Sequence, residues 1–320
     1  MDRRYPPPVT VRPLSVAFLG NAAWSVPSLE ALTRSAHRVA VVLTFPPRPA
    51  GRGSNLRPTR VAESARSMDL PLVEAESVRR GPGRRALAEA APDVLVVVAY
   101  GELLTREVLG AGRLGAVNVH FSLLPAFRGA SPVQHALLEG LRSTGVTTML
   151  MDEGLDTGPV LLQVSEPIRD EDDAGLLGAR LADAGAALLV ETLDRLSAGT
   201  LHPIDQDHAA ATRAPKLGAG DRRLDWRADA TSIVDRVRAL APSPAATTTF
   251  RGEGLKVFRA AVAEGSGDPG VVVEADEAGL RIAAGEGVVR LVEVGPAGRR
   301  RMSGGAFVRG YHPQPGDRIG

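Results

Sequence analysis

The sequence predicts an α/β protein with an open, doubly wound, mostly parallel sheet, followed by a smaller β-barrel domain. From Leu14 the chain alternates short apolar runs with helical patterns, and the run from Val94 to Val98 is apolar throughout. Such a run is typical of a parallel strand that helices cover on both faces. From about Asp221 on, short β-like runs are separated by Gly-containing turns, a spacing that indicates a small barrel.

The individual elements follow from the same patterns. In the first region we expect strands at 14–20, 39–45, 92–101, 116–121 and on both sides of a Gly-rich loop within 145–163, and helices at 26–35, 84–91, 131–140 and 174–197. In the second region we expect one helix at 231–240 and strands at 246–250, 255–262, 270–275, 279–285 and 288–294. Between the two regions the periodicity lapses, which indicates a linker crossing a surface.

These patterns divide the chain into four parts. We predict a flexible N-terminal extension at 1–13, a first domain at 14–199, a linker at 200–220 and a C-terminal domain at 221–320. A chain of 320 residues with 44% hydrophobic residues suits two domains, each with a core of its own.

Composition excludes several classes of function. The sequence has no apolar run long enough to span a membrane and no apolar segment behind its basic start, so we predict a cytoplasmic protein without membrane contact. It has no Cys, which excludes disulfides, thiolate metal sites and Cys nucleophiles. The six His are too scattered to indicate a metal site, so we predict none.

One formal nucleotide-binding motif, GAGRLG at 110–115, is in the wrong context. It follows a predicted helix and precedes a predicted strand, whereas the phosphate-binding fingerprint must follow a strand and begin a helix. We interpret it as the end of a helix followed by a turn.

The stretch NVHFSLLP, which begins at Asn118, contains the strongest candidate site. Residues two apart on a strand face the same way, so Asn118 and His120 share one side. Pro125 ends the strand, which places the pair at the carboxyl end of a strand, where ligand crevices of open α/β sheets form. The loop MDEGLDTG adds Asp156, a carboxylate that would fix the tautomer of the imidazole and favour its protonated form. Its glycines would let the backbone approach a ligand closely.

Two chemistries fit this set. In the first, His120 and Asp156 activate Ser122 as the nucleophile of a hydrolase, although no GxSxG motif surrounds Ser122. In the second, Asn118 and His120 stabilise an oxyanion while an amine of the substrate attacks a bound acyl carbon, and Asp156 manages the protons. The second chemistry needs no nucleophile motif, only Asn118, His120 and Asp156, which the sequence contains.

The segments NVHFSLLPAFRGASPVQ and TGVTTMLMDEGLDTGPVLLQ resemble the folate-dependent formyltransferases, and RPAGRG, APKL and RMSGGAFVRG resemble the methionyl-tRNA formyltransferase family among them. The resemblance covers nearly the whole chain. It implies a Rossmann-like catalytic domain, an OB-like C-terminal barrel that contacts tRNA, and formyl transfer from 10-formyltetrahydrofolate to charged initiator Met-tRNA for translation initiation. We expect a monomer.

The resemblance also assigns roles to residues. By it, the catalytic residues are Asn118, His120 and Asp156. The positions that match the folate-binding segment are Ser122, Leu123, Leu124 and Pro125. The arginines expected to contact tRNA, on an exposed and irregular arm at 45–58, are Arg48, Arg52 and Arg57.

The sequence departs from the family pattern at three places. GNAAW stands where the family usually has GTPEF, so Trp24 replaces a Phe that borders the aminoacyl pocket. PPRPAGRGSN lacks the lysine pair of the usual arm, and LAPSPA at 240–245 lacks the aromatic residue of LNPWPG. Two alternatives therefore stay open, a sugar-nucleotide N-formyltransferase and a non-catalytic tRNA-binding module, and the intact catalytic set argues against the second.

Overall fold

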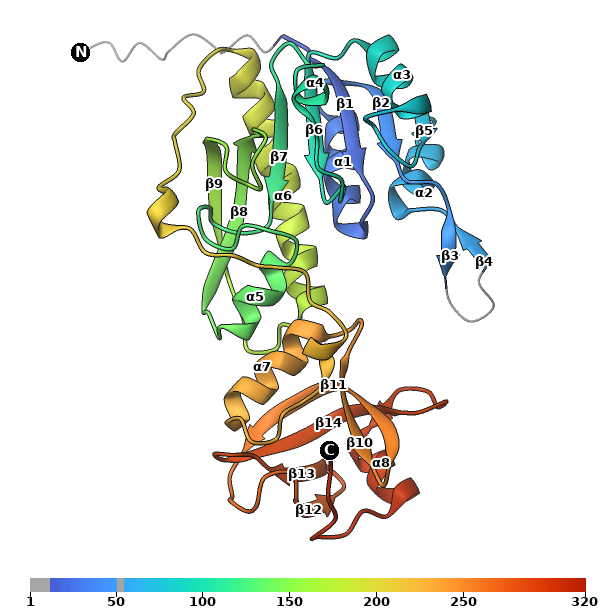
Figure 1. Ribbon diagram of the computed structural model, residues 1–320, viewed down its shortest axis with the longest axis vertical. Coiled ribbons are helices and arrows are strands. Elements are labelled where there is room, and N and C mark those ends of the chain that lie inside the picture. The colour runs from blue at the N-terminus through green and yellow to red at the C-terminus, as the bar shows by residue number, and fades with distance from the viewer. Residues whose placement is uncertain (1–11, 51–54) are drawn as a thin grey trace, which may run out of the picture. The chain divides into compact units, whose positions relative to one another are not determined.

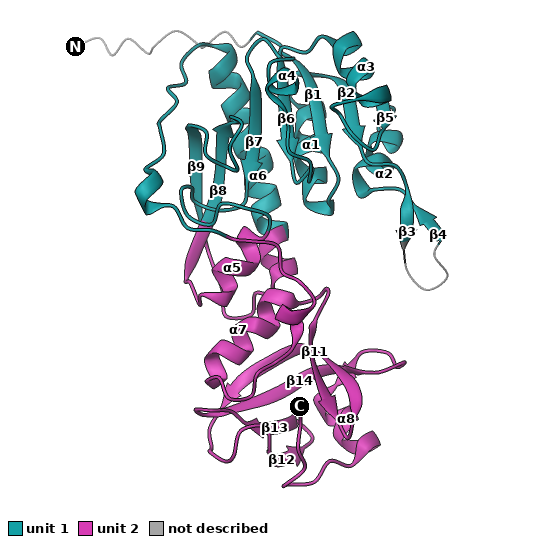
Figure 2. Cartoon of the chain, viewed as in Figure 1, with its two compact units in different colours: residues 1–130, 145–166, 179–213 teal, residues 131–144, 167–178, 214–320 magenta. Residues whose placement is uncertain are grey.

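The computed structural model describes residues 12–50 and 55–320. It divides into two compact units, which Figure 2 shows in different colours. Unit 1 contains residues 1–130, 145–166 and 179–213, and unit 2 contains 131–144, 167–178 and 214–320. These units are discontinuous along the chain, unlike the continuous boundaries drawn from the sequence, which stay a prediction. The predicted N-terminal extension lies outside the described residues except for Arg12 and Pro13.

A seven-stranded sheet forms the centre of the first region, with the strand order β5-β2-β1-β6-β7-β8-β9 (Figure 1). Its strands are β1 (Ser15–Gly20), β2 (Arg38–Thr44), β5 (Leu72–Glu74), β6 (Val94–Val98), β7 (Ala116–His120), β8 (Ser143–Leu150) and β9 (Val160–Pro167). Pairing is parallel from β5 through β7 and antiparallel between β7 and β8. The expected mostly parallel α/β sheet is thus confirmed.

Both faces of this sheet are covered. On β1, Ala17 and Leu19 belong to one apolar cluster, whereas Val16 and Phe18, which point the other way, are also fully buried. All five residues of β6 are buried as well, so the side chains on both of its faces are covered, as the uninterrupted apolar run from Val94 to Val98 predicted. The helices of this region are α1 (Val26–Arg34), α2 (Arg60–Ser67), α3 (Gly81–Ala90), α4 (Arg106–Leu109) and α6 (Ala174–Ser197), with the 3-10 turns η1 (Ala23–Ser25) and η2 (His208–Ala210).

The sequence motif GAGRLG has the structure that its context predicted. Helix α4 ends at Leu109, residues 110–115 form a turn, and β7 begins at Ala116.

The arm that follows β2 is more regular than predicted. Its ends form a two-stranded antiparallel hairpin of β3 (Arg48–Ala50) and β4 (Asn55–Arg57), in which Arg48 pairs with Arg57. The expectation of an irregular arm was therefore wrong for these residues, because the backbone on both sides of the glycines pairs with itself.

Unit 2 contains the antiparallel β domain that the sequence predicted. Its sheet order is β10-β11-β14-β13-β12, with β15 paired to β14. The strands are β10 (Ala246–Phe250), β11 (Glu253–Ala263), β12 (Val272–Asp276), β13 (Gly279–Ala283), β14 (Val288–Pro296) and β15 (Met302–Ser303). Ile319 bridges to Phe250 and Arg318 bridges to Val271, so the C-terminal residues connect the two outer edges of the sheet, as a barrel requires.

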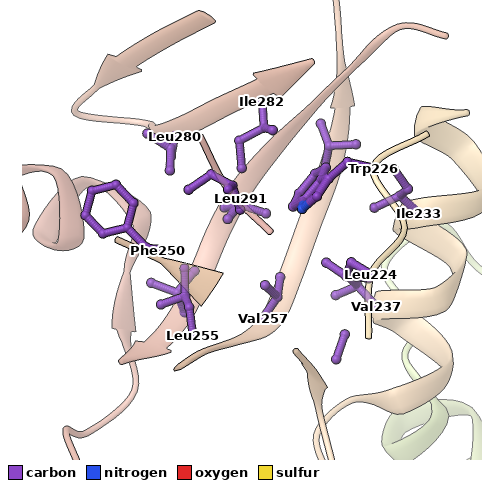
Figure 3. Packing of buried hydrophobic residues seen from close by; sticks show 14 of the residues in the cluster. Leu224, Trp226, Ile233, Val237, Phe250, Leu255, Val257, Leu280, Ile282 and Leu291 are labelled. Carbon is purple, nitrogen blue, oxygen red and sulfur yellow. The ribbon is translucent and has the colours of Figure 1, made fainter. Parts of the chain in front are cut away.

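The helices of unit 2 are α5 (Pro132–Leu138), α7 (Ala230–Leu240) and α8 (Gly304–Tyr311), with the 3-10 turn η3 (Gly220–Arg222). The core of the β domain contains residues of its sheet, of α7 and of α8 (Figure 3). Ile233 and Val237 of α7 belong to the same buried cluster as Trp226, whose indole N–H donates to Thr248 Oγ1 at 3.1 Å. That bond satisfies the polar atom that burial of a Trp would otherwise leave without a partner.

No helix among the described residues is long and apolar enough to cross a membrane.

Candidate active site

Strand β7 presents Asn118 and His120 on one face, as the alternation predicted. Val119 points the other way, against α6, where a Cβ built on Gly185 would lie 2.9 Å from Val119 Cγ1. Asn118 and His120 are only 9% and 5% exposed. Polar groups buried to this extent need hydrogen-bond partners, and those partners define the site.

The imidazole of His120 is held in one orientation. Its Nε2 lies 2.9 Å from the carbonyl oxygen of Phe127, and a carbonyl can only accept, so Nε2 carries a proton. In the neutral ring Nδ1 therefore has the lone pair, and this atom faces Asp156 Oδ2 at 3.7 Å. The nitrogen that can take up and release a proton is thus the one beside the carboxylate.

The carboxylate of Asp156 lies between the two β7 side chains and the loop after them. Its Oδ1 accepts from Asn118 Nδ2 at 3.4 Å, and its Oδ2 accepts from the backbone N–H of Gly129 at 2.8 Å. Asp156 has a positive φ of 54°, a conformation that non-Gly residues adopt rarely. The structure therefore brings together the three residues that the sequence singled out, from two segments almost forty positions apart.

The glycines of the Asp156 loop have a different role from the one expected. A Cβ on Gly158 would lie 1.8 Å from the carbonyl oxygen of Leu150, and a Cβ on Gly154 would lie 1.9 Å from Thr157 Oγ1. The protein's own backbone and side chains fill these spaces, so the close approach of the loop to itself explains both glycines without a ligand.

Ser122 is not placed as a nucleophile. It is fully buried, and its hydroxyl donates to the carbonyl of Ala126 at 2.6 Å. The hydroxyl of Thr147 donates to the carbonyl of Ser122 at 2.7 Å and accepts from the backbone N–H of Leu124 at 3.0 Å. These bonds fix the turn Ser122–Pro125, in which Leu124 is buried while Leu123 and Pro125 are partly exposed. The geometry thus gives no support to the hydrolase chemistry.

Two residues of the predicted linker, Gln206 and Thr212, contribute to the site without a signal in the sequence, and Arg128 of the quoted stretch joins them. The amide Nε2 of Gln206 donates to the carbonyls of Asp156 and Gly158 at 3.0 and 2.7 Å, although Gln206 lies in the predicted linker. Thr212 Oγ1 accepts from the N–H of Phe127 at 2.8 Å. Arg128 donates to Gln206 Oε1 through both Nε and Nη2. An aperiodic segment carries no pattern that could have indicated such contacts.

The other predicted site residues lie on the first two loops of the sheet. Trp24 is partly exposed in η1, and its ring meets that of Phe121 edge to face at 5.9 Å. The guanidinium of Arg48 lies 4.6 Å above the ring of Phe45, and its side chain is 60% exposed. Arg57 is exposed, whereas Arg52 lies outside the described residues.

A cavity of about 400 Å³ lies at the base of the β3–β4 arm. Basic, apolar and other polar side chains line it, with one carboxylate: Asn21, Phe45, Pro46, Arg48, Pro49, Arg57, Pro58, Thr59, Arg60 and Glu63. Arg60 is paired with Glu63 at 2.8 Å, and Arg48 lies 3.4 Å from Glu76, a longer and more exposed contact. The cavity therefore presents positive charge next to apolar surface.

Among residues 12–50 and 55–320, no group of three or more His, Asp or Glu side chains is arranged to hold a metal ion. The buried amide and imidazole and the partly buried carboxylate are instead donors and acceptors suited to a carbonyl that becomes negatively charged.

Comparison with known proteins identifies the class to which this fold and site belong. Residues 14–193 match the formyl transferase family, and residues 216–312 match the family of formyl transferase C-terminal domains. The chain is therefore a formyl transferase. The methionyl-tRNA formyltransferase of Aromatoleum aromaticum is 43% identical over 97% of this chain and 98% of its own length, and that of Solibacter usitatus is 42% identical over 96% and 99%. The chain belongs to the methionyl-tRNA formyltransferase family, as its motifs indicated.

Solved structures share the fold. An N-formyltransferase from Helicobacter canadensis, in complex with folinic acid and dTDP-3-aminofucose, superposes with a TM-score of 0.64 at 15% identity, over 87% of this chain and 98% of that one. HypX from Aquifex aeolicus in complex with tetrahydrofolic acid has a TM-score of 0.64 at 20% identity, over 93% of this chain. This chain spans about half of HypX, 47%.

Proposed function

We propose that the chain transfers the formyl group of 10-formyltetrahydrofolate to the free amino group of initiator methionyl-tRNA by direct attack of that amine. The observation that carries this proposal is the convergence of Asn118, His120 and Asp156 on one buried cluster at the carboxyl end of β7. Membership of the family supports the choice of reaction.

The reaction needs a group that stabilises negative charge on the formyl oxygen. The amine nitrogen forms a bond to the formyl carbon, whose oxygen becomes the oxyanion of a tetrahedral intermediate. Asn118 has two amide N–H groups, of which one is directed to Asp156, so the second can donate to the oxyanion. His120 can add a second donor at Nδ1 when the ring is protonated, because Nε2 is already committed to Phe127.

The reaction also needs one proton to move from the attacking amine to the leaving folate nitrogen. Asp156 is acceptor-only when ionised and lies 3.7 Å from Nδ1 of His120, so it can take the proton that the attacking amine loses. The oxyanion then re-forms the carbonyl, the bond between the formyl carbon and the folate nitrogen breaks, and the same proton passes from Asp156 to that nitrogen. No bond to the enzyme forms, in keeping with the buried and bonded hydroxyl of Ser122.

The folate cosubstrate is proposed to bind along the turn that follows β7. Because the Ser122 hydroxyl is already bonded to Ala126, this residue would contribute through the shape of the turn, and the partly exposed Leu123 and Pro125 would offer contact surface. Leu124 is buried, and its N–H donates to Thr147 Oγ1, which holds the turn in place.

The acceptor is proposed to meet the β3–β4 arm and Trp24, and the C-terminal β domain is proposed to contact the tRNA as well. Arg48 and Arg57 are adjacent in the hairpin and line one cavity, which gives the arm a concentrated positive charge. Such charge suits the phosphates of an RNA end. We further propose that the protein works as a monomer in the cytoplasm.

A sugar-nucleotide N-formyltransferase would use the same chemistry on another acceptor. One assay separates the two: wild-type protein, 10-formyltetrahydrofolate, and either charged initiator tRNA or an amino-sugar nucleotide. We expect formylation of Met-tRNA to be faster by at least tenfold, about 1.4 kcal/mol in transition-state free energy. Faster formylation of the amino sugar would refute the acceptor assignment, and no transfer to either would refute the chemistry and favour a non-catalytic module.

A further inference from the structure

The segment 201–213, which the sequence indicated to be a surface linker, forms part of the wall of the active site. Gln206 within it is only 7% exposed. Its amide nitrogen donates to the backbone carbonyls of Asp156 and Gly158, and its amide oxygen accepts from Arg128 at 3.1 and 2.6 Å. A single buried side chain thus joins the loop that carries Asp156 to the loop that follows β7.

Six residues further along, Thr212 contacts the backbone of the loop that follows β7. Its hydroxyl accepts from the N–H of Phe127, and its carbonyl accepts from the N–H of Arg128 at 2.9 Å. Phe127 is the residue whose carbonyl fixes the ring of His120. The segment therefore contacts both backbones that orient the His120–Asp156 pair.

The segment 201–213 contacts two residues whose backbone conformation is unfavourable. Asp156 and Phe127 both have positive φ, at 54° and 59°. For non-Gly residues this region costs free energy, and it persists only where surrounding contacts impose it. Gln206 bonds the carbonyl of Asp156 itself, so it acts directly on the residue whose conformation is unfavourable.

We propose that Gln206 is a positioning residue for catalysis, which holds the Asp156 loop so that the carboxylate lies against Asn118 and His120. The proposal rests on the catalytic role proposed for Asp156. It predicts that removing the amide hydrogen bonds lowers turnover and leaves substrate binding almost unchanged.

Three variants of the segment test this. Gln206→Leu removes all the hydrogen bonds, whereas Gln206→Glu keeps an acceptor for Arg128 but cannot donate to the carbonyls of Asp156 and Gly158. Ile204→Ala is the matched control, because Ile204 has an exposed side chain and reaches the protein through its backbone pairing with Val160. We expect both Gln206 variants to lower kcat roughly 10- to 100-fold, the range for a misplaced catalytic group, with KM for tRNA and folate within about twofold. The control should match wild type.

A double-mutant cycle with Asp156→Asn separates positioning from general stabilisation. If Gln206 acts through the Asp156 carboxylate, adding Gln206→Leu to Asp156→Asn should lower kcat by less than about threefold more, since coupled residues are not additive. Full additivity, or unchanged kcat in Gln206→Glu, would overturn the proposal. If Gln206→Leu does not fold, the double-mutant cycle with Asp156→Asn is measured with Gln206→Glu instead. If Asp156→Asn alone keeps wild-type turnover, the role proposed for Asp156 fails instead.

Discussion

The catalytic cluster on β7 and the β3–β4 arm belong to the same compact unit and differ in almost every physical respect. Asn118 and His120 are buried, and each is held by a hydrogen bond, from Asn118 Nδ2 to Asp156 and from His120 Nε2 to the carbonyl of Phe127. On the arm, Arg48 and Arg57 are exposed, and the nearest carboxylate to Arg48, that of Glu76, is itself exposed. A cluster of oriented, largely buried polar groups suits bond making, while exposed charge suits recognition of a large polyanion.

This difference predicts that substitutions in the two regions act on different kinetic constants. Groups that are held before the substrate arrives stabilise the transition state, so their removal appears in kcat. Exposed cations that meet phosphates contribute to binding, so their removal appears in KM and in its dependence on salt.

The largest effect is expected at the catalytic cluster. Asn118→Ala or His120→Ala should lower kcat by about 10²- to 10³-fold, the cost of removing one oxyanion donor, and Asp156→Asn should cost at least as much. Single-turnover formylation assays measure this, with thermal unfolding as the control for folding. An effect confined to KM would mean that the cluster binds substrate without stabilising the transition state.

A smaller effect is expected at the arm. Arg57→Ala should raise KM for Met-tRNA severalfold with kcat and folate KM nearly unchanged, and the slope of log K against log salt should fall by roughly 0.7 to 0.9 for each phosphate that is no longer neutralised. Arg52→Ala, outside the described residues, is predicted to behave alike. Arg34→Ala is the matched control, an exposed arginine in the last turn of α1, away from the arm. Equal effects at Arg34 and Arg57 would mean that only net charge matters.

Ser122→Ala tests whether the cluster contains a nucleophile. The variant should keep substantial activity, because the hydroxyl is bonded to the carbonyl of Ala126 and not to His120. Leaving that partly buried carbonyl without its donor should lower the free energy of unfolding by about 1 kcal/mol. Denaturant unfolding measures the stability, and mass spectrometry of the enzyme under turnover checks for a formyl adduct. If the wild-type enzyme accumulates a formyl adduct and Ser122→Ala is inactive, the mechanism with Ser122 as nucleophile is supported instead.

The smallest effect concerns His37, which is buried like the cluster but has no proposed role in catalysis. Its Nδ1 accepts from the N–H of Leu14, and its Nε2 lies 3.2 Å from Asp194, off the line of a good hydrogen bond. Burial lowers the pKa of His37 below its ordinary value of 6.5, against the opposing effect of Asp194. The unfolded chain therefore binds the proton more readily, so stability should be full above pH 6.5 and should fall as the pH drops below it.

A pH series of denaturant unfolding measures this effect. His37→Gln, which can both accept from Leu14 and donate to Asp194 without titrating, should flatten the pH dependence below pH 6.5. An unchanged dependence in that variant would place the acid sensitivity at another residue.

Local patterns of residues were enough to predict most elements and the catalytic set. Apolar runs and helical periods located most strands and helices, because burial on one face or on two leaves a pattern in consecutive residues. The short elements β5 and α2 and the C-terminal helix α8 went unpredicted, since few residues leave little periodicity. Asn118 and His120 were placed on one face because strand geometry is local, Asp156 was added as a carboxylate of the Gly-rich loop MDEGLDTG, and the family resemblance assigned the three their roles.

How that set is held depends on contacts that appear only in the folded chain. The carbonyl of Phe127 selects the tautomer of His120, and the loop glycines are needed for contacts within the protein. Gln206 reaches Asp156 from fifty positions away along the chain, in a segment without periodicity. Such contacts depend on where distant backbones meet, and that meeting is set by the packing of the whole sheet and its loops, which no local pattern of residues encodes.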